Sequence, residues 1–184
     1  MPTLAELLVQ VDSAVSDIVE LEQSLVQIPS VNSGFMPTGD ETPVCKFVQG
    51  WLAEDGVNSE IIESAPNRGN IVAQLEGRSG TPGLMFVSHT DVVPVEDQSK
   101  WSFEPFAGTI ASGRVYGRGA SDCKALLAAQ MMAVRILKRN DIKLDEGLLL
   151  VSFADEEHGG RYGAGWMAEH YPEKITAPYA INEG

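Results

Sequence analysis

Four side chains with acid or imidazole groups recur along the 184-residue chain, each shortly after an apolar run. They are His89 in FVSHTD, Asp122 in GRGASD, Glu157 in ADEE and Glu183 in INEG. Nitrogen and carboxylate donors without a thiolate suit zinc, and manganese or cobalt can take its place. The pattern therefore predicts a metal site built from residues that are far apart in the sequence.

Asp155, Glu156 and Glu157 are successive acids that directly follow the apolar stretch 147–154. Two carboxylates about 4 Å apart repel by about 1 kcal/mol in water and by about 4 kcal/mol at an intermediate dielectric. No Lys or Arg occurs between Glu157 and Arg161, so a bound cation is the expected compensating charge, with a fully solvated turn as the alternative. One glutamate could bind metal while the other moves a proton from a metal-activated water to a leaving nitrogen. That chemistry is hydrolysis.

His89 and Asp91 are two residues apart, so an extended chain would place both side chains on one face. The Asp91 carboxylate could then accept the second N–H of the imidazole and fix the orientation of the ring. A histidine that only fills a structural role after a strand is the alternative. The adjacent Asp and the later acids favour the metal ligand.

Composition limits the class of protein. The 43% apolar content fits one domain of ordinary size, and the formal charge of −13 argues against nucleic acid or an anionic membrane as partner. Cys45 and Cys123 show no paired spacing, which favours a reducing compartment and hence a cytoplasmic protein. Residues 1–30 carry acids throughout, unlike a secretory signal, and no apolar run reaches membrane-spanning length.

Hydrophobic spacing predicts alternating helices and strands. Apolar residues at helical spacing predict helices at 3–27, 43–55, 122–139 and 163–170. The helix at 122–139 is apolar almost all round and is expected to be buried. Short apolar runs bounded by turn residues predict strands at 57–63, 70–75, 84–88, 147–154 and 179–181. We therefore expect an α/β fold with a mostly parallel central sheet flanked by helices.

The candidate ligands follow these elements. His89, Glu157 and Glu183 each come just after an expected strand, where ligands collect in open α/β sheets. Asp122 is instead expected to open the long buried helix, whose N-terminus would favour its negative charge. The predicted fold thus gives a reason for the four side chains to converge.

Four motifs together resemble a known family. They are HTDVVP at 89–94, GRGASDCK at 117–124, DEEHGG at 155–160 and NEG at 182–184. In order and spacing they are similar to the co-catalytic zinc metallopeptidase and amidohydrolase family of acetylornithine deacetylase, succinyl-diaminopimelate desuccinylase, aminoacylase and glutamate carboxypeptidase. The resemblance covers about residue 4 to Gly184, and the combination is specific where HTD or DEE alone is weak.

The resemblance implies a role for each residue. Asp122 would bridge two zinc ions, His89 and Glu183 would complete one site, and Glu157 would belong to the other. Asp91 would orient His89, and Glu156 would be the general base and acid. The resemblance also implies a cis peptide bond between Asp122 and Cys123.

The family is longer than this sequence. The resemblance implies that residues 1–184 are the N-terminal portion of the catalytic domain, without the lid or dimerisation domain and the C-terminal part that carries a late His. We therefore expect the chain alone to be inactive and the full-length form to be a homodimer. The expected substrate is a peptide or an N-acyl amino acid, and the sequence leaves dipeptidase, exopeptidase and deacylase open.

Two other classes of function are alternatives. A non-catalytic α/β binding or assembly module could keep the family core, but such a module has no reason to retain acids clustered at a repulsive cost. Nucleotide binding is set aside, because glycines at 113–119 lack the GxGxxG order after a first strand and no GxxxxGK[ST] motif occurs.

Overall fold

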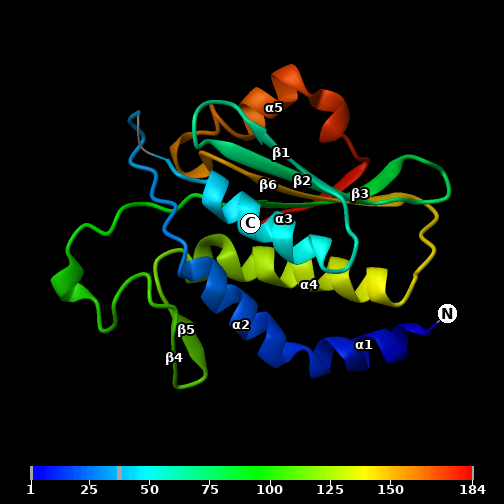
Figure 1. Ribbon diagram of the computed structural model, residues 1–184, viewed down its shortest axis with the longest axis horizontal. Helices are drawn as coiled ribbons and strands as arrows, with labels where there is room; N and C mark the ends of the chain where they lie inside the picture. Colours follow the sequence, from blue (N-terminus) through cyan, green and yellow to red (C-terminus); the bar gives the residue numbers. More distant parts are fainter. Residues whose placement is uncertain (1, 37–38, 184) are drawn as a thin grey trace.

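The computed structural model describes residues 2–36 and 39–183. Its centre is a five-stranded sheet in the order β1-β2-β6-β3-β7, with helices on both faces (Figure 1). Each strand overlaps a predicted one: β1 Ser59–Glu63, β2 Gly69–Leu75, β3 Pro82–His89, β6 Gly147–Phe153 and β7 Tyr179–Ile181. The predicted α/β class with a central sheet flanked by helices is confirmed.

The central strand β6 holds the two layers of the core together. All seven of its residues are buried, because β2 and β3 pair with its two edges and helices cover both faces. Leu148 and Leu150 belong to the core under α2, α3 and α4, whereas Leu149 and Val151 pack on the side of α5. This alternation explains why an uninterrupted apolar run forms a strand here.

The direction of the strands is mixed. Strand β3 is parallel to both β6 and β7, as predicted, but β2 is antiparallel to both β1 and β6. The tight turn 64–68 joins β1 to β2, and only antiparallel strands can be joined by so short a connection. The parallel part of the sheet is therefore the part that ends in His89, the DEE motif and Glu183.

The predicted helix 3–27 is two helices, α1 (Leu4–Ser13) and α2 (Val15–Val26), which meet at Ala14. Helix α2 buries Leu21, Leu25 and Val26 in the core, whereas α1 has no buried residue. The break lets α1 run beside the end of α4, where the amides of Gln10 and Asn140 bond each other. Periodicity continues through the break, so the sequence pattern does not reveal it.

The other helices agree with the prediction within three residues. They are α3 (Thr42–Ala53), α4 (Ala125–Arg139) and α5 (Ala164–His170), and α4 is largely buried as expected. Helices α3 and α4 lie on one face of the sheet and α5 lies on the other (Figure 1). Within residues 2–36 and 39–183, every helix falls short of the length and apolarity that a membrane crossing requires.

The long connection after β3 contains a hairpin that the sequence analysis did not predict. Its strands, β4 (Thr109–Ala111) and β5 (Arg114–Tyr116), have three residues each, too few for an alternating pattern to show. Ser112 and Gly113 both have positive φ, as the two central residues of a tight hairpin turn require. The Ser-Gly pair was the available signal.

Candidate metal centre

His89 is the last residue of β3 and is 1% exposed. Its Nδ1 lies 3.0 Å from the main-chain oxygen of Asp91 and 3.4 Å from the carboxylate Oδ1. Asp91 therefore does lie beside the ring, as the spacing predicted, but its carbonyl is the nearer acceptor. With Nδ1 held in this way, Nε2 points toward Asp122 and is the atom available to a metal.

Asp122 lies in the turn Ala120–Lys124, three residues before α4 begins at Ala125. The expectation that it opens the helix is wrong: its φ of −125° and ψ of 96° are extended, and its peptide bond to Cys123 is cis, as the resemblance implied. Its carboxylate lies against the end of β3. Its Oδ1 lies 2.8 Å from His89 Nε2.

Glu156 and Glu157 occupy a 3₁₀ turn after β6, Glu156–His158. The chain reverses at Asp155, whose φ is +62°. The main-chain N–H of Glu156 donates to Asp91 Oδ1 at 3.0 Å, and that of Glu157 donates to Oδ2 at 3.2 Å. Asp91 therefore fixes the turn after β6 as well as the ring at the end of β3.

Glu183 follows β7 and completes the group. Its Oε1 lies 3.4 Å from His89 Nε2, and Glu156 Oε2 lies 3.9 Å from the same atom. Donor atoms of His89, Asp122 and Glu157 all lie within 4.8 Å of one another, and so do those of His89, Cys123 and Glu183. The structure thus brings all six predicted site residues together at one end of the parallel strands.

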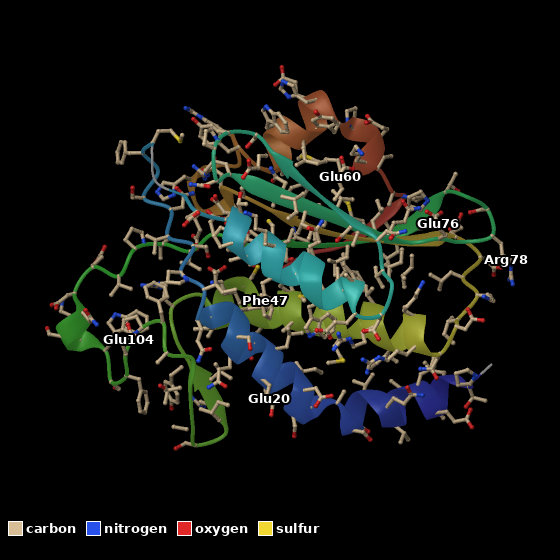
Figure 2. The ribbon with its side chains drawn as sticks, viewed as in Figure 1. Glu20, Phe47, Glu60, Glu76, Arg78 and Glu104 are labelled. Carbon is tan, nitrogen blue, oxygen red and sulfur yellow. The ribbon has the colours of Figure 1, made fainter. Side chains whose placement is uncertain are left out.

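The site acids lie close together, although Asp122 and Glu156 remain largely exposed, at 69% and 54%. Figure 2 shows Glu20, Glu60 and Glu104 on separate parts of the molecule, and all three are exposed. At the site, partial burial raises the pKa of Glu156 and Glu157, and neighbouring carboxylates raise it further. Burial opposes a charge on His89, but its hydrogen bonds to Asp91 and Cys123 raise its pKa to about 12. The neighbouring Asp91 thus favours a positive charge on the His89 ring.

Asp91 shows the opposite shift. Burial alone would raise its pKa, but hydrogen bonds from His89 and Asn32 lower it below the ordinary value. Asp91 is therefore held as a carboxylate that accepts hydrogen bonds, which suits an orienting group rather than a proton carrier.

The sequence analysis missed a buried polar group behind the site. Asn32, Glu41 and Arg68 are each at most 2% exposed, and they connect to Asp91 and Asp155 through side-chain hydrogen bonds. No spacing marks them, because Asn32 lies 59 residues before Asp91 and 123 before Asp155. Three isolated polar residues in loops carry no periodic signal.

The remaining cysteine and histidines take structural positions. Cys123 is buried and its Sγ accepts the N–H of His89 at 3.2 Å, in agreement with the predicted packed thiol. His158 packs beside Gly34, and His170 ends α5 and stacks on Trp166 with ring centroids 4.6 Å apart. Neither histidine belongs to the metal-ligand groups found among the described residues.

The donor chemistry suits the predicted metal. One imidazole nitrogen and several carboxylate oxygens, converging from four segments, form an N/O set that divalent zinc, manganese or cobalt accepts. Among the described residues, the ion pairs of Asp122, Glu156 and Glu183 all go to the imidazole of His89, which places these acids around one nitrogen.

Known proteins share this fold and these motifs. A curated succinyl-diaminopimelate desuccinylase of Parvibaculum lavamentivorans is 35% identical over 157 residues, covering 83% of this chain and 37% of that protein. An M20 family metallo-carboxypeptidase of Sulfolobus solfataricus superposes with a TM-score of 0.75 at 25% identity, covering 91% of this chain and 37% of that one. The structure of human carnosine dipeptidase 1 superposes with a TM-score of 0.79 at 19% identity, covering 99% of this chain and 41% of that one.

The chain spans less than half the length of each of these three proteins. The model of a protein family described as Peptidase family M20/M25/M40 matches residues 85–184. These residues are more than half of the chain and include all six candidate site residues. The resemblance stated from the motifs is thereby confirmed, and the chain belongs to Peptidase family M20/M25/M40.

Proposed function

We propose that this chain is part of the catalytic domain of a zinc-dependent hydrolase that cleaves an amide or peptide bond. The observation that carries the proposal is the approach of His89, Asp122 and Glu157 to within 4.8 Å, with Glu156 and Glu183 beside them. These residues come from the ends of β3 and β6, the turn before α4 and the segment after β7. A binding module would need none of this convergence.

The proposed ligands are those that the resemblance implied. Asp122 would bridge two zinc ions, with His89 and Glu183 on one and Glu157 on the other, and manganese or cobalt are plausible substitutes. Bound divalent ions would polarise the scissile carbonyl and lower the pKa of a water. The protein supplies the orientation: Asp91 lies beside the His89 ring, whose Nε2 is 2.8 Å from Asp122 Oδ1.

Glu156 is the proposed general base and acid. Its carboxylate is half-exposed, 3.9 Å from His89 Nε2, and partial burial and nearby Glu183 raise its pKa above the ordinary value. A raised pKa improves a carboxylate as a proton carrier near neutral pH. Glu156 would take a proton from the attacking water and give it to the leaving nitrogen, while its backbone N–H stays fixed on Asp91.

The substrate class follows from the relatives. One is a desuccinylase, which removes an acyl group, and another is a carboxypeptidase. We propose a peptide or N-acyl amino acid as substrate, hydrolysed at its C–N amide bond. Because the chain spans 37% of these relatives, we also propose that residues 1–184 alone are inactive. That the full-length form is a homodimer stays a proposal that rests on the family resemblance alone. The charge of −13 and the two free cysteines support a cytoplasmic location.

The test compares three forms of the full-length protein. Bound zinc is measured by elemental analysis, and hydrolysis is measured with N-succinyl amino acids and with dipeptides. Glu156→Gln should keep its zinc and lose about 10²–10⁴-fold in kcat. Glu169→Gln, an exposed position on α5, is the matched control and should keep full activity.

Three results would contradict the proposal. Wild-type protein that binds no divalent metal would remove its basis. Turnover that survives intact in Glu156→Gln would exclude the assigned proton carrier. Wild-type protein that binds metal but cleaves neither substrate class would favour the non-catalytic module.

A further inference from the structure

Asn32 is a fully buried carboxamide that joins two site carboxylates. Its Nδ2 donates to Asp91 Oδ2 at 2.9 Å and to Asp155 Oδ1 at 2.9 Å. Its Oδ1 accepts the N–H of Gly34 at 2.9 Å, which holds the amide in this orientation. All three of its hydrogen-bonding groups are used, and its side chain is 0% exposed.

The geometry requires a neutral group with two N–H donors. Asp91 and Asp155 are 1% and 3% exposed, and a carboxylate offers only acceptors. An aspartate at position 32 would place a third buried acid between them, and a serine would donate to one of them only. A carboxamide can bond both carboxylates without adding charge to a cluster that is already acidic.

Both carboxylates that Asn32 touches hold catalytic parts in place. Asp91 accepts the N–H groups of Glu156 and Glu157 and lies beside His89 Nδ1. Asp155 is the positive-φ residue from which the Glu156–His158 turn starts. Asn32 therefore connects the end of β3 to the turn after β6, the two segments that present His89 and Glu157.

Arg68 and Tyr162 also hold Asp155 in place. Arg68 donates from a terminal guanidinium nitrogen to Asp155 Oδ1 at 2.9 Å, the oxygen that also accepts from Asn32. Its Nε donates to Glu41 at 2.8 Å. Asp155 Oδ2 accepts the N–H of Tyr162 at 3.2 Å, so both of its oxygens are held.

We propose that Asn32 is a positioning residue of the metal centre, which sets metal affinity by holding Asp91 and the Glu156–Glu157 turn in one arrangement. The inference rests on the proposed metal-dependent function. Partners of ligand-orienting groups change metal affinity or activity by about 10–100-fold when they are removed. Asn32 acts through Asp91 and Asp155, since its side-chain hydrogen bonds go to these two carboxylates and to the N–H of Gly34.

The experiment uses the full-length protein and zinc as the probe. Zinc affinity is measured by competition with a chromophoric chelator for wild type, Asn32→Ser and Asn32→Leu. The same substitutions at Asn140 are the matched controls, because Asn140 also bonds through its amide but lies at the far end of α4. Thermal unfolding with a chelator present separates loss of fold from loss of metal binding, and kcat and KM are measured at saturating zinc.

We expect Asn32→Ser to bind zinc about 10–100-fold more weakly, with a lower kcat and a KM within about twofold of wild type. The Asn140 variants should lose stability without losing zinc affinity. Asn32→Ser removes little volume and decides the question where Asn32→Leu does not fold. Zinc affinity within twofold of wild type in folded Asn32→Ser would overturn the inference and leave Asn32 a structural residue. Wild type without zinc affinity would instead overturn the proposed function.

Discussion

Glu41 gives a prediction about stability and pH that the structure fixes in sign. Its side chain is 0% exposed, its Oε2 lies 2.8 Å from Arg68 Nε, and its Oε1 has no hydrogen-bond partner among the described residues. Arg68 shares its single positive charge between Glu41 and Asp155. Burial therefore outweighs the attraction to Arg68 and raises the pKa of Glu41 from 4.5 to about 7.

The magnitude follows from linkage between protonation and folding. A carboxyl group with a raised pKa in the folded state binds more protons folded than unfolded, so the free energy of unfolding falls as pH rises through 4.5 to about 7. At about 1.4 kcal/mol per pH unit, the full effect is about 3 kcal/mol. Between about pH 5.5 and about pH 8, the part that can be measured away from the isoelectric point is about 2 kcal/mol.

The assay compares wild type with Glu41→Gln by urea unfolding followed by tryptophan fluorescence at about pH 5.5 and about pH 8. A chelator is present so that metal binding adds no pH dependence of its own. Gln and protonated Glu both place a donor where Oε1 lies, so the variant represents the uncharged state. Wild type should lose about 2 kcal/mol relative to the variant as pH rises. Glu20→Gln, on the exposed surface of α2, controls for the loss of one charge.

The opposite result has a clear meaning. If attraction to Arg68 outweighed burial, Glu41 would be ionised at both pH values and Glu41→Gln would be the less stable protein at each. A stability difference that stays constant, or that grows in favour of wild type toward pH 8, would refute the reasoning. It would show that the buried triad of Glu41, Arg68 and Asp155 is held together by ion pairing.

Three further changes have expected outcomes. Asp91→Asn turns an NH₂ toward groups that all donate, so zinc affinity in chelator competition should fall about 10–100-fold; unchanged affinity would contradict the orienting role. When free zinc is present at about 100 times its Kd for the full-length protein, removing the zinc should lower the free energy of unfolding by about 2.7 kcal/mol and lower the Tm. An unchanged Tm argues against a metal bound by the folded state. Gly163→Ala places a Cβ 1.7 Å from the Ala154 oxygen and should lower the free energy of unfolding by about 3 kcal/mol or more. Gly50→Ala meets open space in α3 and should raise it by roughly 0.5–1 kcal/mol. Equal urea midpoints for the two variants would count against the packing at Gly163.

The sequence predicted best where one physical signal dominates. The run GLLLVSF has to be buried on both faces and was found as β6, and the apolar face of α4 fixed that helix within three residues. Three of the ligand candidates, His89, Glu157 and Glu183, were identified because they follow predicted strands, and Asp122 because it precedes the predicted buried helix. Their convergence followed from the parallel pairing of β6, β3 and β7, which places the carboxyl ends of these strands together.

The sequence failed where geometry depends on contacts between distant segments. The break at Ala14 has no Gly or Pro to mark it, and it is set by the packing of α1 beside α4. Asp122 looked like the first residue of a helix because the apolar periodicity starts near it, yet its extended conformation places it before the helix. Asn32 and Arg68 gave no signal, since Asn32 bonds Asp91 59 residues away and Arg68 bonds Asp155 87 residues away.

The arrangement also explains how the chain tolerates its own acids. Five carboxylates approach one imidazole at this end of the sheet, and in isolation each pair would oppose folding. The buried strands β3 and β6 impose the arrangement, because their side chains form the core on both faces. Behind the site, one shared guanidinium and one carboxamide satisfy Asp91 and Asp155 with little added charge. At the front of the site, Asp122, Glu156, Glu157 and Glu183 gather around the imidazole of His89, and a bound cation would balance these carboxylates while leaving His89 to act as a neutral ligand.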